Sequence, residues 1–283
     1  MSPLRQKMTD AMCQRGFSIR THKSYIEAVA KFSRFHQKSL AQASDDDLAR
    51  YFEHLVRDCK LSPSTCRVYW GALRFLFEKV LDQPTVMRKV VLPKRGQQLP
   101  GLLSAKEVRT LVSATDNLKH RAMLLTCYGC GLRVSELVCL HVRDIDGERR
   151  ILRVEKGKGN KDRDVDLSAA TLDLLRRYWS EYRPTDWLFP NENTQNALSV
   201  STPQKVYIQC KADAGIEKRG GIHALRHAYA THQLEAGMAV HKLQRSLGHR
   251  SVESTMHYVH YVSDYQAGTS TKVDLVGELD LKS

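Results

Sequence analysis

The sequence lacks the patterns that identify several common classes of enzyme. It contains no glycine-rich nucleotide-binding loop, no pair of carboxylates spaced for acid–base chemistry and no HExxH motif. His223 and His227 stand four residues apart on a predicted helix, but no third ligand for a metal ion accompanies them. We therefore expect a protein that works without a metal ion or an organic cofactor.

The sequence also has no pattern of disulfide bonds and no membrane span. Its seven cysteines are odd in number and lie in predicted helices of a long chain, which favours a reducing compartment. Cys127 and Cys130 form one C-x-x-C, but no second pair completes a zinc site, so we interpret both as small core residues. No apolar run approaches the ~20 residues of a membrane-spanning helix, and the first residues lack the apolar stretch of a signal peptide. These absences predict a cytoplasmic protein with no membrane partner.

What the sequence does have is an excess of positive charge, concentrated in its first third. Lys and Arg total 44 against 31 Asp and Glu in 283 residues, a net charge of +13. Residues 1–96 hold 18 basic and 9 acidic residues, whereas the remainder holds 26 and 22. This imbalance of +9 against +4 predicts that the first third binds a polyanion, and nucleic acid is the partner that it favours. A basic domain without such a partner is the alternative.

Four helical patterns fill this first third. They begin near residues 3, 19, 45 and 63, and their apolar stripes include Phe35 in the second and Val68 in the fourth. Ser44 and Ser62 are predicted N-caps, and the three aspartates after Ser44 suit a helix N-terminus better than a metal site. Basic residues on the other faces of the fourth helix are either a solvated surface or contacts to DNA phosphates; these are Arg67, Arg74 and Lys79.

Residues 83–101 carry three prolines, two glycines and no clear periodicity, which is typical of a linker. We place the domain boundary at residues 96 and 97, so that residues 97–283 form the second domain. Ser104 and Glu107 then open its first helix with a capping box. The linker is basic as well, and its candidate DNA-binding residues are Arg88, Lys89, Lys94 and Arg95.

The second domain is predicted to be mostly helical with a small antiparallel sheet. Residues 150–155 and 162–167 alternate like strands and are joined by a glycine-containing turn. Helices are predicted at about 117–129, 132–140, 168–182, 202–213, 223–236, 239–247 and 252–262. The fold class is therefore mainly α with a small antiparallel β-sheet, as a helical domain followed by an α+β domain.

Two arginine motifs in this domain share one spacing. Arg133 and Glu136 are three residues apart on a predicted helix, as are His223 and Arg226 at the start of another. A guanidinium oriented by a carboxylate can present its planar fork to phosphate oxygens, and a helix N-terminus attracts phosphate. Each motif alone is more often an ordinary surface pair.

Three further residues complete a set that suits one task. Lys158 is predicted at the tip of the hairpin, with Lys156 and Lys161 as rivals; Lys161 is also a candidate DNA contact. His249 follows a helix break, and Tyr258 lies nine residues later, with Tyr261 and Tyr265 as rivals. Phosphoryl transfer depends on positioning and on stabilising charge, and tyrosine can act as a covalent nucleophile. Together these cations, imidazoles and the phenol predict an enzyme that cuts and rejoins nucleic acid through a covalent tyrosine link.

Several motifs resemble those of one family. GLRVSEL, GKGNKDR, HALRHAYATH and LGH with Tyr nine residues later occur in the order found in the tyrosine recombinases, the phage integrase family. The chain looks most like the simple Xer-type bacterial members over essentially its whole length. The resemblance implies that Arg133, Arg226 and His249 bind the scissile phosphate, and that Glu136 supports them. It implies that Lys158 is the general acid, that His223 assists proton transfer and that Tyr258 forms a 3′-phosphotyrosine.

The same resemblance implies a DNA clamp and an assembly. Residues 1–96 would be the core-binding domain and residues 97–283 the catalytic domain, which together close around double-stranded DNA. A tetramer would act on two sites with inverted-repeat cores, as a homo-tetramer or with a related recombinase, and would exchange strands through a Holliday junction. The tail after Tyr261 has an apolar side and is the candidate docking element.

Two other functions stay open at this point. A type IB topoisomerase uses similar chemistry to relax DNA without exchanging partners, and a DNA-binding regulator could keep the scaffold without catalysis. The separate basic helical domain favours recombination over relaxation, and the complete residue set favours an enzyme over a regulator. Chromosome or plasmid resolution and mobile-element integration are equally compatible with the sequence.

Overall fold

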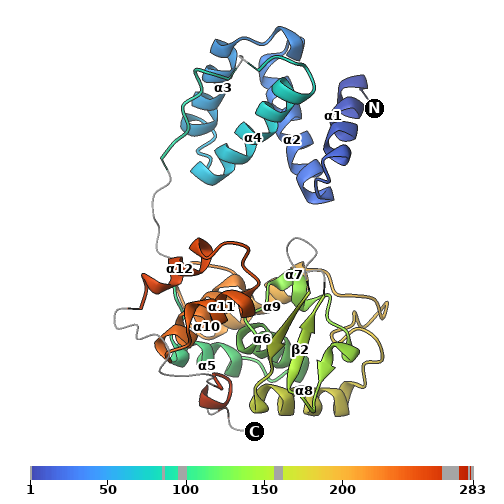
Figure 1. The fold of residues 1–283 in the computed structure, drawn as a ribbon, viewed down its shortest axis with the longest axis vertical. Helices are drawn as coiled ribbons and strands as arrows, with labels where there is room; N and C mark the ends of the chain where they lie inside the picture. Colours follow the sequence, from blue (N-terminus) through green and yellow to red (C-terminus); the bar gives the residue numbers. More distant parts are fainter. Residues whose placement is uncertain are drawn as a thin grey trace. The chain divides into compact units, whose positions relative to one another are not determined.

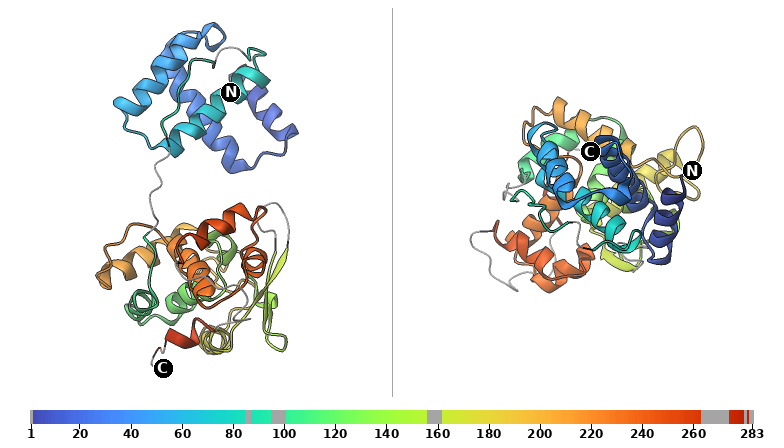
Figure 2. Two further views of the ribbon diagram at one scale, coloured as in Figure 1. Left: turned by 60° about the vertical axis from the view of Figure 1, so that its left-hand side comes forward. Right: turned by 90° about the horizontal axis from the view of Figure 1, so that it is seen from above.

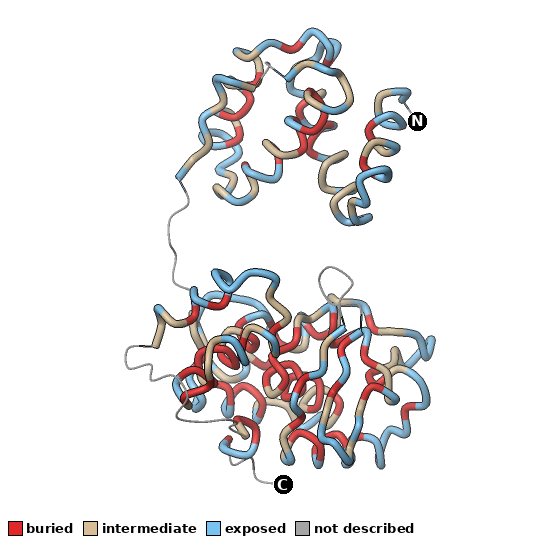
Figure 3. Tube along the Cα trace, viewed as in Figure 1, coloured by how far each residue is buried: buried red, intermediate tan, exposed pale blue. Residues whose placement is uncertain are grey.

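A computed structural model of the chain describes residues 2–84, 87–94, 101–155, 162–262, 274–279 and 281. The chain divides into two compact units, Met1–Gln98 and Leu99–Ser283, which are called the N-terminal unit and the C-terminal unit below. Each unit has its own buried interior (Figure 3). No helix within the described residues is long and apolar enough to cross a membrane.

The N-terminal unit is built from helices that begin at serine N-caps. Its helices are α1 (Pro3–Gln14), α2 (Ile19–His36), α3 (Asp45–Arg57) and α4 (Pro63–Lys79), with the short 3₁₀ turn η1 (Leu40–Gln42) between α2 and α3 (Figure 1). The side chains of Ser2, Ser18, Ser44 and Ser62 each accept a hydrogen bond from a backbone N–H in the first turn. Since these N–H groups have no partner within the helix, the serines fix where each helix starts.

Aromatic side chains fill the interior of this unit. Phe32 of α2 packs against Tyr51 of α3 and Phe77 of α4, with ring centroids 5.0 and 6.3 Å away. Two residues of the predicted apolar stripes, Phe35 and Val68, lie outside this interior, since they are 42% and 43% exposed. Phe35 instead stacks against His54 at the edge of the core, where one ring face stays in contact with solvent.

The segment after α4 is attached to the N-terminal unit rather than separate from it. Met87, Val90 and Leu92 pack against the core of that unit. The backbone N–H of Arg88 donates to the Asp45 carboxylate, and Lys89 forms a 2.9 Å ion pair with Asp46. The first two aspartates of α3 therefore hold this segment, while the third, Asp47, closes the capping box with Ser44.

The C-terminal unit is mainly helical with one small sheet. Its helices are α5 (Ala105–Ser113), α6 (Leu118–Gly129), α7 (Val134–Leu137), α8 (Ala169–Tyr182), α9 (Ser201–Asp213), α10 (His223–Glu235), α11 (Val240–Leu247) and α12 (Glu253–Val259), with 3₁₀ turns η2 (Val142–Asp144) and η3 (Gly277–Leu279). Helix α6 is buried along most of its length and packs against α8, α9 and α10. Ser104 and Glu107 form the predicted capping box at the start of α5.

The sheet lies along one side of the C-terminal unit (Figures 1 and 2). Within the described residues it has three antiparallel strands in the order β1 (Ile145–Asp146), β2 (Ile151–Val154) and β3 (Arg163–Asp166). Leu152 pairs with Val165, and both point into the core. Residues 156–161, which connect β2 to β3, are outside the described residues. The predicted fold class, mainly α with a small antiparallel sheet, is confirmed.

The last described segment packs onto the C-terminal unit itself. Leu275, Val276 and Leu279 are buried, and η3 contacts α5 and α8. Val276 lies so close to Gly129 that a Cβ atom there would be 2.7 Å from its methyl group. Arg109 of α5 also donates a hydrogen bond to the Glu278 carbonyl at 3.2 Å. Residues 274–279 and 281, called the tail segment below, are thus held by apolar burial and by hydrogen bonds.

Candidate active site

The site begins where the chain turns between α6 and α7. Gly131 has a φ of +57°, and a Cβ atom there would lie 2.4 Å from the Tyr229 ring, so only glycine fits this turn. Arg133 follows as the N-cap of α7, with extended backbone angles. The prediction of a helix over 132–140 was therefore wrong, because α7 has a single turn and Arg133 precedes it. Glu136 reaches back to the backbone N–H of Arg133 at 2.8 Å and to its guanidinium at 2.7 Å.

Glu136 is the centre of a cluster of three arginines. Both of its oxygens accept hydrogen bonds of 2.9 Å from Arg163 at the start of β3, and Arg226 lies 3.8 Å away. Burial alone would raise the pKa of this carboxyl, but the hydrogen bonds and charge of Arg163, together with Arg133, lower it to about 2. Glu136 is therefore ionised at neutral pH and offsets part of the charge that the arginines bring together.

Arg226 is the largest fully buried side chain among the described residues. It donates hydrogen bonds to the carbonyls of Gly131 at 2.7 Å and Leu247 at 2.6 Å, which ties the turn before α7 to the end of α11. Burial, and then the charge of Arg133, lowers its pKa to about 10. The guanidinium thus keeps its charge at neutral pH although it is almost completely removed from water.

Helix α11 ends at Gly248 in the left-handed conformation, and His249 follows directly. The Nδ1 atom of His249 shares a 2.9 Å hydrogen bond with the hydroxyl of Thr255. The His249 ring is also nearly parallel to the Tyr258 ring, with 6.2 Å between centroids and 8° between planes. The glycine turn therefore brings His249 back against α12 and beside Tyr258.

Tyr258 lies in α12 with only 5% of its surface exposed. Its hydroxyl shares a 2.8 Å hydrogen bond with Nδ1 of His227. Burial raises the pKa of this phenol, while the charges of Arg226 and Arg133 act in the opposite direction. Tyr261, one of the rivals for its role, instead shares a hydrogen bond with His257, and Tyr265 is outside the described residues.

His223 opens α10 after two glycines, as the sequence predicted. Desolvation by the surrounding protein atoms, and then the charges of Arg226 and Arg133, lowers its pKa although the residue is exposed, which favours the neutral imidazole. It contacts His227 edge to face, with 5.3 Å between ring centroids. Five of the six predicted catalytic residues thus lie in one neighbourhood: Arg133, His223, Arg226, His249 and Tyr258.

Sequence reasoning missed two contributors to this neighbourhood. Arg163 lies inside the GKGNKDR motif, and its burial at the first position of a strand was not apparent from spacing. His227 was considered only as a partner for zinc, although it contacts the Tyr258 hydroxyl. Within the described part of the chain, no group of three or more His, Cys, Asp or Glu side chains is placed to hold a metal ion.

The other predicted residues lie elsewhere or outside the description. Lys158 and its rivals Lys156 and Lys161 fall in 156–161, outside the described residues, as does Arg95. The remaining candidate DNA-binding residues are exposed on the N-terminal unit: Arg67, Arg74, Lys79, Arg88, Lys89 and Lys94. Two of them have acidic neighbours, since Arg74 pairs with Glu78 and Lys89 pairs with Asp46.

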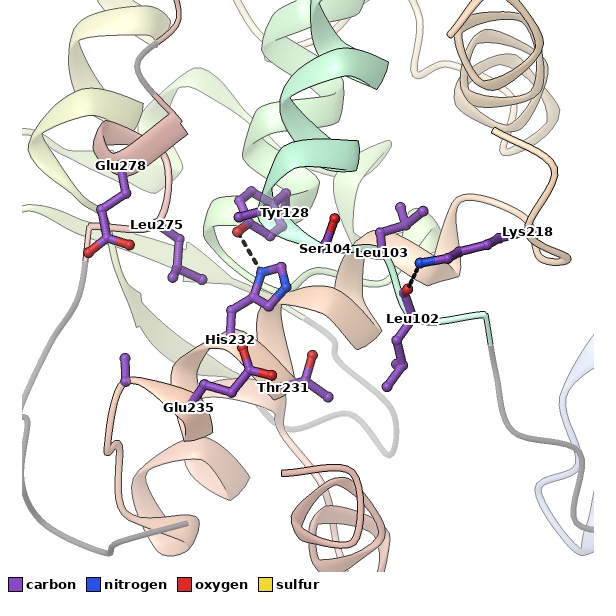
Figure 4. A pocket seen from close by; sticks show the side chains of 12 residues that line it. Leu102, Leu103, Ser104, Tyr128, Lys218, Thr231, His232, Glu235, Leu275 and Glu278 are labelled. Atoms are coloured by element: carbon purple, nitrogen blue, oxygen red, sulfur yellow. Dashed lines mark hydrogen bonds between the residues drawn. The ribbon is translucent and has the colours of Figure 1, made fainter. Parts of the chain in front are cut away.

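A cavity of about 440 Å³ also opens between α5, α10 and the tail segment (Figure 4). Tyr128 and His232 share a 2.8 Å hydrogen bond in its wall, and Lys218 donates to the Leu102 carbonyl. Leu275 and Glu278 of the tail segment line the same cavity. None of the predicted catalytic residues lines it, so it is separate from the cluster around Tyr258.

The phage integrase family model matches residues 102–264, and the phage integrase N-terminal SAM-like domain matches residues 4–86. The protein y4qK of Sinorhizobium fredii, whose name places it among the integrases and recombinases, is 39% identical over 98% of this chain and 90% of its own length. Tyrosine recombinase XerD of Pseudomonas putida is 31% identical over 91% of this chain and 92% of its own. The chain therefore belongs to the phage integrase family and is a tyrosine recombinase.

The fold agrees with this assignment. The crystal structure of the XerH site-specific recombinase, in a post-cleavage complex with its palindromic difH substrate, superposes with a TM-score of 0.75. It covers 93% of this chain and 82% of XerH at 23% identity. The family predicted from the sequence motifs is confirmed by the family models and the relatives, and the fold by this superposition.

Proposed function

We propose that this protein is a site-specific DNA recombinase that cleaves and rejoins double-stranded DNA through a 3′-phosphotyrosine at Tyr258. The observation that carries the proposal is the Tyr258 hydroxyl, buried against two histidines and within the fields of Arg133 and Arg226. A phenol that served only to fill the core would not need a buried and a half-buried guanidinium beside it.

The proposed cleavage step is an in-line displacement at phosphorus. The Tyr258 oxygen bonds to the phosphorus as the bond to the 5′ oxygen breaks, so the energy of the phosphodiester is kept in the new ester. Arg133, Arg226 and His249 would hold the non-bridging oxygens, where negative charge builds in the transition state. His223 would assist proton transfer, and Glu136 would keep the arginines in position.

The general acid would be Lys158, which would protonate the leaving 5′ oxygen. Its place in GKGNKDR, between β2 and β3, supports this role, because Arg163 at the end of the same motif reaches the arginine cluster. Rejoining reverses the step when a 5′ hydroxyl attacks the phosphotyrosine. If the attacking hydroxyl comes from the partner duplex, the result is a strand exchange and a Holliday junction.

The N-terminal unit would bind DNA alongside the catalytic unit, as a clamp. Its net charge of +9 and the exposed cations on α4 and on the segment after it support this role. Paired sites with inverted-repeat cores are proposed by analogy with XerH, whose substrate is palindromic. A tetramer on two such sites, of one chain or with a related recombinase, would need a docking element, and the tail segment is our candidate.

The experiment that tests the proposal uses nicked suicide substrates. Duplexes are taken from DNA flanking the coding region that contains inverted repeats of about one helical turn each. The wild-type protein should form an SDS-resistant adduct, Tyr258→Phe should form none, and Tyr261→Phe should form it normally. An adduct that survives Tyr258→Phe but not Tyr261→Phe would identify Tyr261 as the nucleophile instead of Tyr258. Relaxation of plasmids without any such site would favour topoisomerase activity instead.

A further inference from the structure

His227 is the group in direct hydrogen-bond contact with the Tyr258 hydroxyl. Its Nδ1 lies 2.8 Å from the phenolic oxygen, and the two rings are 5.5 Å apart. It directly follows Arg226 in α10, so the same helix turn that fixes the buried guanidinium also fixes this imidazole. His223 contacts the edge of the His227 ring.

The other imidazoles near Tyr258 are engaged differently. Nδ1 of His249 bonds to Thr255, and its ring lies parallel to the phenol ring rather than end-on to the hydroxyl. Nε2 of His257 bonds to the Tyr261 hydroxyl. Of these rings, His227 is the one whose nitrogen is already placed where a proton acceptor for the phenol has to be.

The surroundings of His227 keep it neutral in the free protein. Burial, and then the nearby His223, Arg226 and His257, lowers its pKa to about 4. Tyr258 faces it from α12, and the charge of Arg133 acts on the same phenol. A neutral imidazole has one nitrogen that can accept, and in the tautomer with the ring proton on Nε2 the phenol donates to Nδ1.

We propose that His227 is the general base of strand cleavage, and this inference rests on Tyr258 being the nucleophile. As the bond from the Tyr258 oxygen to phosphorus forms and the bond to the 5′ oxygen breaks, the phenolic proton moves to Nδ1 of His227. The leaving oxygen takes its proton from the separate general acid. On rejoining, His227 returns its proton to the tyrosine oxygen as that oxygen leaves phosphorus.

This assignment predicts a tyrosine that stays unreactive until DNA is bound. In the free protein a neutral histidine faces a phenol whose pKa is raised by burial, so neither group is charged. A phosphodiester that enters the site brings a negative charge beside the imidazole, which favours the imidazolium form. The base therefore becomes stronger when the substrate is present.

The test measures single-turnover adduct formation by the full-length protein on the nicked suicide substrate. His227→Ala should slow the reaction by about 10²- to 10³-fold with unchanged DNA affinity. His227→Asn, which can still hydrogen-bond to the phenol but cannot take its proton, should be equally slow. In both variants the rate should rise about tenfold per pH unit between pH 7 and 9, since hydroxide must then remove the proton. Added imidazole should partly restore the rate of His227→Ala.

His257→Ala is the matched control, because His257 also lies beside Tyr258 but bonds to Tyr261; it should react at close to the wild-type rate. A His227→Asn variant as fast as wild type would overturn the proposal, since positioning alone would then suffice. A faster His227→Ala would also overturn it and would make His227 a restraint on the tyrosine. In either case the adduct at Tyr258 would still form, so the proposed function would stand. A wild-type protein that forms no adduct at Tyr258 would instead refute the proposed function.

Discussion

Arg163 and Glu136 form a bidentate ion pair in which two guanidinium nitrogens each lie 2.9 Å from a carboxylate oxygen. The third nitrogen of Arg163, Nε, donates to the Ser246 carbonyl at 2.7 Å. One side chain at the start of β3 therefore fixes both the carboxylate that orients Arg133 and the end of α11 that precedes His249. The pair thus joins three segments, which are the turn before α7, the start of β3 and the end of α11.

Arg163→Lys should slow DNA cleavage by up to about a hundredfold while leaving DNA affinity nearly unchanged. Lysine keeps the charge but cannot make the forked contact to Glu136 and the contact to Ser246 together, and small displacements of catalytic groups cost that much. Single-turnover cleavage and binding would be measured on one substrate. Arg153→Lys is the control, because Arg153 lies on the neighbouring strand and its side chain is in an exposed 3.7 Å pair with Asp162. Equal defects in both variants would contradict a positioning role.

Glu136→Gln should destabilise the protein most at neutral pH. The pKa of Glu136 is lowered to about 2 in the folded chain, so its ionised form stabilises the fold above the unfolded pKa of about 4.5. That contribution, on the order of 3 kcal/mol, is lost as the pH falls through the folded pKa. Urea unfolding of the two proteins should therefore differ at pH 7, begin to converge below pH 4.5 and come together only near pH 2. A difference that does not change with pH would mean that the charge of Glu136 contributes nothing.

Local features of this chain were predictable, and contacts between distant segments were not. The N-cap at Ser44 and the capping box at Ser104 could be predicted because their signals span at most four residues, and the order of the catalytic motifs indicated the family. Arg163 and Glu136 are 27 residues apart, and no spacing rule relates a strand to a turn at that separation. The contact of His227 with Tyr258 spans 31 residues and depends on how α10 packs against α12.

Arg67 and Arg74 are seven residues apart on α4 and so lie on one exposed face of that helix. Replacing both with Gln should weaken DNA binding and reduce the slope of log affinity against log salt by about 1.8, if each contacts one phosphate. Binding would be measured from 50 to 300 mM salt with the full-length protein. Arg57→Gln is the control, since Arg57 is exposed on α3 and paired with Glu53. An unchanged slope in the double variant would exclude this face of α4 from the DNA interface.

Leu279→Asp tests the tail segment as a docking element. Leu279 is only 1% exposed and lies where η3 contacts α5 and α8. A charge there should release the segment, and the fold should lose the stabilisation from burying a leucine side chain, about 1.5–3 kcal/mol. The thermal midpoint should fall, whereas Ile208→Asp on the exposed face of α9 should change it little. If the segment also docks on a neighbouring protomer, Leu279→Asp and deletion of 264–283 should keep single-site cleavage and lose recombination between two sites. Recombination at the wild-type rate by either variant would show that the tail segment is not needed for assembly. Its role would then be limited to covering the core of its own unit.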